Sequence, residues 1–364
     1  MFSIESIPAE HPTPSLLVDA DAVRVNVTRM QRYCNENNLA LRPHTKTHKS
    51  VWMAKMQRDC GAVGLTVAKM GEAAVMANVC SEILIAYPTI GQARLNALVN
   101  LSKSANLIIG IDSKAASEMI AQAVSKAGNQ VGILVDIDVG FHRTGIDSLQ
   151  ETLELAEFVD RMPGLELQGL MCFPGHLLPS SDATAWEKYA ESMGVIVQSF
   201  RNKGLCADIV SGGSTPTACL SAKNPWLTEI RPGTYIYNDV NEIRLGVATL
   251  EQCAARVLAT VVSRANDHKF VLDCGSKTLS SDRCGPAPES GFGYVVEYPT
   301  AKVTRLSEEH GEVELASGVA PAIGSRVTIV PNHICVCVNL QDKYWLFDNQ
   351  EWTQMPVDAR GLLV

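Results

Sequence analysis

Residues Gly132–Ile137, with the sequence GILVDI, form a short apolar run that is typical of a buried strand. Ser148–Arg161 follows as an amphipathic stretch of helical length, and Leu165–Cys172 is a second buried-strand pattern. A strand, a helix and a strand in this order predict a β–α–β unit, in which the two strands run parallel.

The same alternation continues in both directions and gives eight strand patterns. They are Leu39–Pro43, Val63–Ala68, Ile83–Tyr87, Leu107–Ile111, Gly132–Ile137, Leu165–Cys172, Ala207–Val210 and Thr228–Pro232. The helix patterns between them are Ser50–Asp59, Lys69–Asn78, Ile90–Ser102, Lys114–Lys126, Ser148–Arg161, Ala183–Lys203 and a shorter one near Pro216–Ala222. Eight β–α units predict the α/β class and a (β/α)8 TIM barrel. A doubly wound open sheet has the same alternation but usually fewer strands, so the number of strands favours the barrel.

After about residue 245 the pattern changes to short strand-like runs separated by Gly, Pro and charged residues. These runs are Ala254–Ser263, Phe270–Cys274, Gly293–Val296, Glu312–Ala316, Arg326–Val330, Ile334–Val338 and Tyr344–Asp348. Near the N-terminus, Pro14–Asp19 is a strand pattern before a helix pattern, Ala20–Asn35, which Asp19 or Asp21 can cap. We therefore expect a barrel over residues 20–245 and a smaller, mainly antiparallel β domain from residues 1–19 plus 246–364.

Composition excludes several classes of protein. The net charge is −8 and the basic residues are scattered, which argues against a nucleic-acid partner. No apolar run has transmembrane length, and the N-terminal residues lack the layout of a signal peptide. The eleven cysteines are irregularly spaced and lie mostly in apolar segments, which indicates reduced, buried thiols. We expect a cytoplasmic globular enzyme with no membrane partner.

Lys46 is the first candidate for chemistry, because it follows the first strand of the expected barrel in Arg42–Lys49 (RPHTKTHK). Active sites of such barrels lie in the loops after the strands. Desolvation and nearby positive charge lower the proton affinity of a lysine, which can then attack a carbonyl such as the aldehyde of a pyridoxal cofactor. The alternative is a solvated basic loop, and the octapeptide alone does not decide between them.

Further polar residues follow later strands at the same expected rim. Arg143, between Gly140 and Gly145, can contact a cofactor ring or a substrate carboxylate, or it can be a surface ion-pair arginine. His176 follows the sixth strand and is either functional or a capped loop histidine. Arg231 lies at the eighth strand.

The segment Ser211–Thr217 follows the seventh strand and contains glycines and hydroxyls. Gly213 lets the backbone N–H groups approach an anion, and Ser214 and Thr215 add hydroxyl donors, which is the chemistry of a phosphate site. Barrel phosphate sites commonly follow strands seven and eight. A plain turn is the alternative.

A second constellation, His333 and Cys335, lies far along the chain in the expected strand Ile334–Val338. Residues two apart on a strand face the same way, so an imidazole and a thiolate would lie side by side as half of a zinc site. Water, substrate or another residue must complete the site, and an open position of this kind suits catalysis. Cys337 is expected in the core.

With these residues assembled, the chain resembles the fold-type III pyridoxal-phosphate enzymes, and more narrowly the D-serine dehydratase / D-threonine aldolase group of the alanine racemase superfamily. The resemblance runs through nearly the whole chain. It is carried by Thr13–Asp19, Arg42–Lys49, Asp138–Gly145, Gly175-His176, Gly212–Thr217, Glu229–Tyr235, Asp273–Lys277, Ser307–Gly311 and Asn332–Cys335.

The resemblance implies a role for each of these site residues. Lys46 would form the Schiff base with pyridoxal 5'-phosphate, and Arg143 would lie by the cofactor ring. Ser214, Thr215 and neighbouring backbone including Gly213 would hold the phosphate, together with Tyr235. His333 and Cys335 would bind a divalent metal, with zinc expected and manganese or magnesium as alternatives. A head-to-tail homodimer is also implied.

The implied reaction is that of a lyase on a small D-configured β-hydroxy-α-amino acid. Lys46 would take the α-proton, and D-serine or D-3-hydroxyaspartate would give a 2-oxo acid and ammonia. Aldolases of the group tend to carry aspartate at the position of Cys335, so this cysteine favours a dehydratase. The sequence departs from the common pattern at Phe173, where relatives often have tyrosine, which leaves the substrate open.

Other reactions remain as alternatives. A D-threonine aldolase would break Cα–Cβ to give glycine and an aldehyde, with His48 or His176 as the base. An amino-acid racemase would need a second base and no metal. A non-catalytic pyridoxal-phosphate carrier of the small single-barrel type would lack the C-terminal β domain.

Overall fold

The computed structural model describes residues 2–364, which form two compact units. The barrel unit comprises Arg29–Lys46, Val51–Gly233 and Leu362–Val364, and the β unit comprises residues 2–28, Thr47–Ser50 and Thr234–Gly361. The chain thus leaves the barrel unit after Lys46 and returns to it at Val51. These units are defined by packing, whereas the expected domain bounds at residues 19 and 245 follow the change of sequence pattern and stay a prediction.

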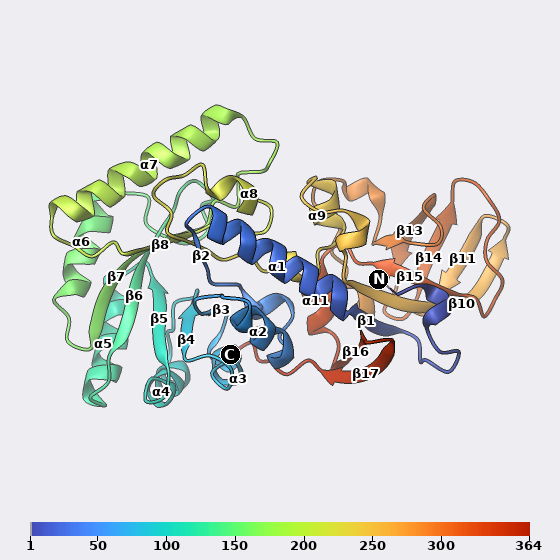
Figure 1. The fold of residues 1–364 in the computed structure, drawn as a ribbon, viewed down its shortest axis with the longest axis horizontal. Helices are drawn as coiled ribbons and strands as arrows, with labels where there is room; N and C mark the ends of the chain where they lie inside the picture. Colours follow the sequence, from blue (N-terminus) through green and yellow to red (C-terminus); the bar gives the residue numbers. More distant parts are fainter. Residues whose placement is uncertain (1) are drawn as a thin grey trace. The chain divides into compact units, whose positions relative to one another are not determined.

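The barrel unit is built on eight parallel strands in the order β2-β9-β8-β7-β6-β5-β4-β3 (Figure 1). They are β2 (Ala40–Leu41), β3 (Leu65–Val67), β4 (Glu82–Ile85), β5 (Asn106–Ile111), β6 (Val131–Ile137), β7 (Leu165–Cys172), β8 (Ile209–Gly212) and β9 (Glu229–Ile230). A parallel bridge between His44 and Thr66 and a hydrogen bond from Val63 N to Leu41 O, 2.9 Å, join β2 to β3. The ring is therefore closed, and the predicted barrel is confirmed.

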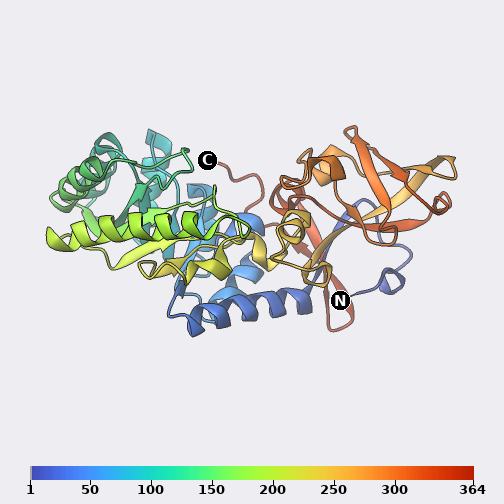
Figure 2. The same ribbon diagram turned by 90° about the horizontal axis from the view of Figure 1, so that it is seen from above.

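Helices alternate with these strands as expected. They are α2 (Val51–Asp59), α3 (Met70–Met76), α4 (Gln92–Leu101), α5 (Lys114–Lys126), α6 (Leu149–Asp160), α7 (Ala183–Asn202) and α8 (Ala218–Ser221). In Figures 1 and 2, α4 to α7 lie on the outside of the strands. Every residue of β6 is buried, including Asp136, because helices cover one side of the strand and the barrel interior lies on the other.

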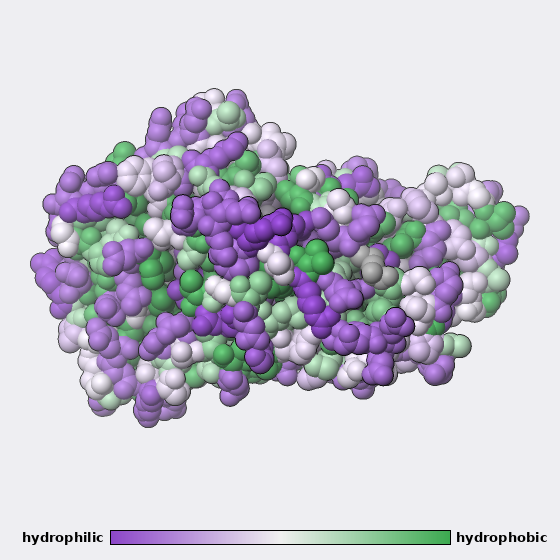
Figure 3. All heavy atoms as spheres, in the orientation of Figure 1, coloured by the Kyte–Doolittle hydropathy of each residue, from purple (hydrophilic) through white to green (hydrophobic). Residues whose placement is uncertain are grey.

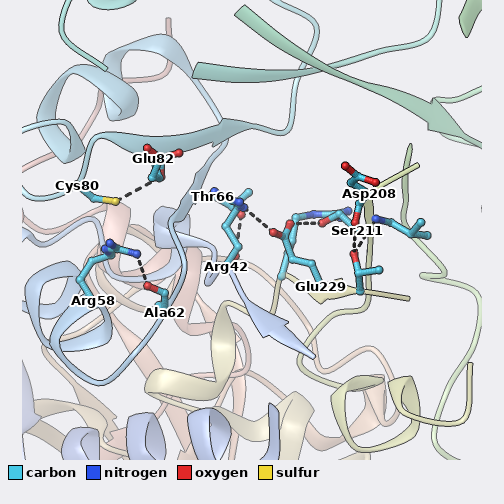
Figure 4. A network of polar contacts seen from close by, with 12 residues as sticks. Arg42, Arg58, Ala62, Thr66, Cys80, Glu82, Asp208, Ser211 and Glu229 are labelled. Atoms are coloured by element: carbon cyan, nitrogen blue, oxygen red, sulfur yellow. Dashed lines mark hydrogen bonds and ion pairs between the residues drawn. The ribbon is translucent and has the colours of Figure 1, made fainter. Parts of the chain in front are cut away.

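A buried ion pair lies inside the barrel unit (Figure 4). Arg42 Nε donates to Glu229 Oε2 at 2.7 Å, and the two side chains are only 7% and 3% exposed. Glu229 Oε1 also accepts a hydrogen bond from Ser211 Oγ at 2.5 Å. Because Arg42 directly follows β2, side chains link the end of β2 to β9 and β8, in addition to the backbone ladder between these strands.

We expect Glu229→Gln to lower the free energy of unfolding by about 3–5 kcal/mol, because breaking a buried pair leaves the charge of Arg42 uncompensated. Urea denaturation followed by circular dichroism measures the change. The matched control is Glu154→Gln, which removes an exposed pair with Lys114 and is expected to cost less than about 1 kcal/mol. Equal losses in the two variants would contradict the prediction.

The β unit contains a nine-stranded, mostly antiparallel sheet. Its strands are β1 (Ser15–Asp19), β10 (Ala255–Asn266), β11 (Lys269–Leu272), β12 (Tyr294–Val295), β13 (Ala301–Leu306), β14 (Gly311–Leu315), β15 (Arg326–Val330), β16 (Lys343–Asp348) and β17 (Glu351–Pro356). Strand β1 pairs antiparallel with β10 and parallel with β16. The predicted second, mainly antiparallel sheet is confirmed, and the N-terminal strand β1 belongs to it.

The prediction of one strand in the β unit is wrong. The run Ile334–Val338 is part of helix α11 (Ile334–Asn339), and Asp239 Oδ2 accepts the N–H of Ile334 at 3.0 Å at its start. A short apolar run does not distinguish a buried strand from a buried helix by its periodicity. Strands β13 and β17 were not expected from the sequence, because β13 has one buried residue, Val303, and β17 has none.

Helix α1 (Ala20–Glu36) begins as expected. Asp19 Oδ1 accepts the N–H of Ala22 at 2.9 Å, so Asp19 is the residue that caps the helix.

The cysteines of the chain form no disulfide bonds, which agrees with the expectation of reduced, buried thiols. All eleven cysteines are free, and seven of them are buried. Among residues 2–364, no helix is long and apolar enough to cross a membrane. On the face drawn in Figure 3, apolar residues lie among hydrophilic ones.

Candidate active site

Four loops of the barrel unit carry predicted site residues. Lys46 lies in a 3-10 turn, η2 (Thr45–Thr47), after β2, and its side chain is exposed. Arg143 follows β6, His176 follows β7, and Ser214 follows β8. Because the strands are parallel, all four loops lie at the carboxyl end of the barrel strands.

The loop after β8 has the shape and chemistry of a phosphate cradle. Gly213 has φ +72°, and a Cβ there would lie 2.9 Å from Ser221 Oγ and 3.0 Å from Ile230 Cγ2, so glycine is required. Ser214 Oγ lies 3.0 Å from Thr217 Oγ1, which also accepts the N–H of Ser214 at 2.8 Å. Thr215 is buried next to them. The loop thus combines a left-handed glycine with the hydroxyls of Ser214, Thr215 and Thr217, which are donors of the kind that a phosphate accepts hydrogen bonds from.

The loop that carries Arg143 is organised by Asp138. Its Oδ1 accepts the N–H groups of Gly140, Phe141 and His142 at 2.9, 3.0 and 3.0 Å, and its Oδ2 lies 2.8 Å from His142 Nδ1. Burial acts to raise the pKa of Asp138, but the hydrogen bonds from His142 and Gly140 outweigh it and hold the pKa below its usual value. A charged carboxylate thus fixes the turn that leads to Arg143.

Arg143 packs on two aromatic rings. Its Cζ lies 4.6 Å from the ring centroid of Phe173 and 5.2 Å from that of Phe141, and the two rings meet edge to face at 5.1 Å. A Cβ at position 175 would lie 2.3 Å from Phe173 Cε1, so Gly175 makes room for the ring. Cation–π attraction to the two rings orients the guanidinium, and Arg143 is exposed to solvent.

The two candidate histidines differ in their surroundings. His176 is exposed at the rim, where a Cβ on Gly140 would lie 3.2 Å from its ring. His48 belongs to the β unit, is fully buried, and accepts the N–H of Ser50 at Nδ1, 3.0 Å. Of the two, His176 is the one exposed to solvent.

The β unit brings His333 and Cys335 together. His333 is the N-terminal cap residue of α11 and Cys335 lies in its first turn, so the two side chains meet although the segment is helical. The hydrogen bond with Cys335 raises the pKa of His333, burial opposes this, and the hydrogen bond with Asp282 adds to the rise. Burial opposes the charge on Cys335 as well, but the contact with His333 lowers the pKa of the thiol.

Cys337 is a core residue, as predicted. It is fully buried, and burial raises the pKa of its thiol to about 12.

Three contacts of this pair were not expected from the sequence. His333 Nδ1 donates to Asp282 Oδ2 at 2.8 Å, and Cys335 Sγ lies 3.2 Å from Thr47 Oγ1 and 3.8 Å from Thr234 Oγ1. Thr47 directly follows Lys46, so the lysine is one residue along the chain from a side chain that touches the thiol. Asp282 lies in a loop and Thr234 begins the 3-10 turn η3 (Thr234–Ile236), and no pattern of spacing in the sequence marks either residue.

The donors of the pair fit a divalent metal. Imidazole nitrogen and thiolate sulfur are the donors that zinc prefers, and two protein ligands leave positions for water or substrate. Among residues 2–364, no group of three or more His, Cys, Asp or Glu side chains is placed to hold a metal ion. Tyr235, the remaining predicted cofactor contact, is buried in η3 (Thr234–Ile236) of the β unit.

Family models and curated relatives match both units of the chain. Residues 18–240 match the alanine racemase N-terminal domain, and residues 254–347 match the serine dehydratase domain. D-threo-3-hydroxyaspartate dehydratase of Delftia sp. is 32% identical over 89% of this chain and 90% of its own length. D-threonine aldolase of Arthrobacter sp. is 31% identical over 91% of this chain and 87% of its own length.

Solved structures agree with these matches. The crystal structure of D-threonine aldolase from Filomicrobium marinum has a TM-score of 0.90 at 28% identity and covers 98% of both chains. Alanine racemase from Bacillus anthracis has a TM-score of 0.72 at 15% identity, which shows the fold alone.

The architecture is therefore that of the alanine racemase fold with a second β domain. The chain belongs to the family that joins an alanine racemase N-terminal domain to a serine dehydratase domain, whose curated members include D-amino-acid dehydratases and aldolases. The predicted membership of this family of lyases is confirmed.

Proposed function

We propose that this chain is a pyridoxal-phosphate- and metal-dependent dehydratase of D-β-hydroxy-α-amino acids. D-Serine or a D-3-hydroxyaspartate is the proposed substrate, and a 2-oxo acid and ammonia are the products. The observation that carries the proposal is the His333–Cys335 pair, in a chain whose barrel presents Lys46, Arg143 and the cradle after β8 at one rim. The head-to-tail homodimer stays a prediction.

Two similar structures support the metal pair. They are variants of D-threo-3-hydroxyaspartate dehydratase in which a histidine, or the cysteine two positions further on, is replaced by alanine, and the cysteine variant is in a metal-free form. These chains are 28% and 29% identical to this one. His333 and Cys335 have the same order and spacing. Zinc is the proposed metal, because a thiolate ligand is soft.

The cofactor-binding residues have the following proposed roles. Pyridoxal phosphate, when bound, supplies an electron sink for the bond that breaks at Cα. Lys46 would hold the cofactor and then carry the α-proton on Nζ. Gly213, Ser214 and Thr215 would bind the phosphate together with Tyr235, and Arg143 would lie by the ring.

His333 and Cys335 would hold the metal, which supplies Lewis acidity for a leaving β-hydroxyl. The net change is loss of the hydroxyl as water and hydrolytic release of the amine as ammonia.

An aldolase is the second candidate, since an aldolase relative and an aldolase structure match as well as the dehydratases do. In that reaction a base takes the proton of the β-hydroxyl. His176, exposed at the barrel rim, is the candidate for this role.

A substrate panel tests the proposal. The purified protein, loaded with pyridoxal phosphate and zinc, is incubated with D-serine, D-3-hydroxyaspartate and D-threonine, with and without a chelator. We expect 2-oxo acid and ammonia in equal amounts from D-serine or D-3-hydroxyaspartate, and a large loss of activity with chelator. Glycine and an aldehyde would favour the aldolase, and full activity after metal removal would contradict the role of His333 and Cys335.

A further inference from the structure

We propose that Asp282 is a positioning residue for the metal pair, because its carboxylate fixes the tautomer and orientation of the His333 imidazole. This inference rests on the proposed function, in which His333 is a metal ligand. Asp282 Oδ2 accepts the hydrogen bond of His333 Nδ1 at 2.8 Å across 51 residues of sequence.

The chemistry follows from the two ring nitrogens of histidine. A proton held on Nδ1 by a carboxylate leaves the lone pair of a neutral imidazole on Nε2. That nitrogen is then the atom that can ligate a metal, and the negative partner makes it a stronger donor. Without Asp282, His333 could rotate or place its proton on either nitrogen.

The segment around Asp282 is held in place by the segment that carries the ligands. Asn332 Nδ2 donates to the backbone O of Asp282 at 3.0 Å and to that of Gly291 at 2.7 Å, and Asn332 is buried. Asp282 N donates to Ser280 Oγ at 3.1 Å, and Ser280 has φ +67°, a conformation that serine rarely adopts. Both the backbone and the side chain of Asp282 are therefore tied to Asn332 and His333.

The interaction between His333 and Asp282 contributes little to the free energy of unfolding. The side chains of His333 and Asp282 are 40% and 43% exposed, and ion pairs with this exposure contribute little to stability. Stability alone therefore does not account for a carboxylate held in position against Nδ1 of His333. Orientation of His333 as a metal ligand does account for it.

Metal affinity of the folded protein tests the inference. Metal-free wild type, Asp282→Ala and Asp282→Asn are titrated with zinc in competition with a chromophoric chelator, and the melting temperature of each metal-free form is measured. The control is Asp267→Ala, which removes an exposed carboxylate paired with Arg264 in the same unit.

We expect Asp282→Ala to raise the zinc Kd by about 10–100-fold, as is typical for loss of an outer partner of a ligating histidine. Asp282→Asn, which keeps an acceptor but not the charge, is expected to have a smaller effect. Asp267→Ala should bind zinc like wild type, and all metal-free melting temperatures should agree.

Each other outcome counts against a particular claim. Equal zinc affinity of wild type and the Asp282 variants would overturn the inference and leave the proposed function standing. A lower melting temperature with unchanged affinity would overturn it too, by showing a purely structural role. If wild type itself binds no zinc, the proposed function fails together with the inference. If Asp282→Ala does not fold, Asp282→Asn decides by the same comparison.

Discussion

Replacing Lys46 with alanine is expected to abolish turnover and to remove the visible absorbance of lysine-bound pyridoxal phosphate. The side chain is exposed at the barrel rim, and it is proposed both to hold the cofactor and to move the α-proton. Loss of a positioned proton carrier alone typically costs about 10²–10⁴-fold in rate. Turnover is measured as 2-oxo acid release, and absorbance after addition of pyridoxal phosphate to the purified variant.

Lys55→Ala is the matched control, since Lys55 is an exposed lysine of α2 that pairs with Asp59. It should keep both the absorbance and the activity. Borohydride reduction of the loaded wild type, followed by peptide mass spectrometry, should locate the added mass on Lys46. A Lys46→Ala protein that keeps the absorbance of lysine-bound cofactor would show that another lysine holds the cofactor.

Replacing Cys335 with alanine is expected to remove the bound metal and to reduce dehydratase activity by about 10²–10³-fold. This corresponds to about 3–4 kcal/mol of transition-state stabilisation, within the range for Lewis-acid assistance. Metal content is measured by elemental analysis of the dialysed protein, and activity with a saturating D-amino acid.

Cys337→Ala provides the control on the same helix. Cys337 is a fully buried thiol, so its loss tests the cost of altering α11 without removing a proposed ligand. It should retain one metal per chain. Cys335→Asp keeps an anionic ligand and separates the loss of sulfur from the loss of coordination. Equal metal contents in the Cys335→Ala and Cys337→Ala variants would contradict the assignment of Cys335.

The barrel could be predicted because most of its strands are short, mainly apolar runs and helix patterns separate them. The bounds expected for Leu165–Cys172 and Lys114–Lys126 agree with β7 and α5. The β unit gives weaker signals, since an exposed strand such as β17 has no apolar face in its sequence. The run Ile334–Val338 is apolar enough for either a strand or a helix, and tertiary contacts with Asp239 decide for the helix.

The residues of the candidate site could be predicted where the barrel fold or closeness in sequence brings them together. Residues that meet only through the tertiary fold could not. The barrel rule places the loops after parallel strands at one end, so Lys46, Arg143 and Ser214 could be grouped without a structure. His333 and Cys335 were recognisable because they are close in sequence. Asp282 was not, because the fold brings it to His333 from a distant loop.

The pairing of β1 has a consequence for how the protein is made. Strand β1 pairs with β10 and β16, whose first residues are Ala255 and Lys343. Synthesis proceeds from the N-terminus, so residues 15–19 emerge from the ribosome well before either neighbour exists. The β unit can therefore be completed only near the end of translation. Until then the apolar strand β1 lacks both of its neighbours, and its unpaired backbone edges must be kept from pairing with other chains. A nascent chain stalled before residue 255 would lack both neighbours of its first strand.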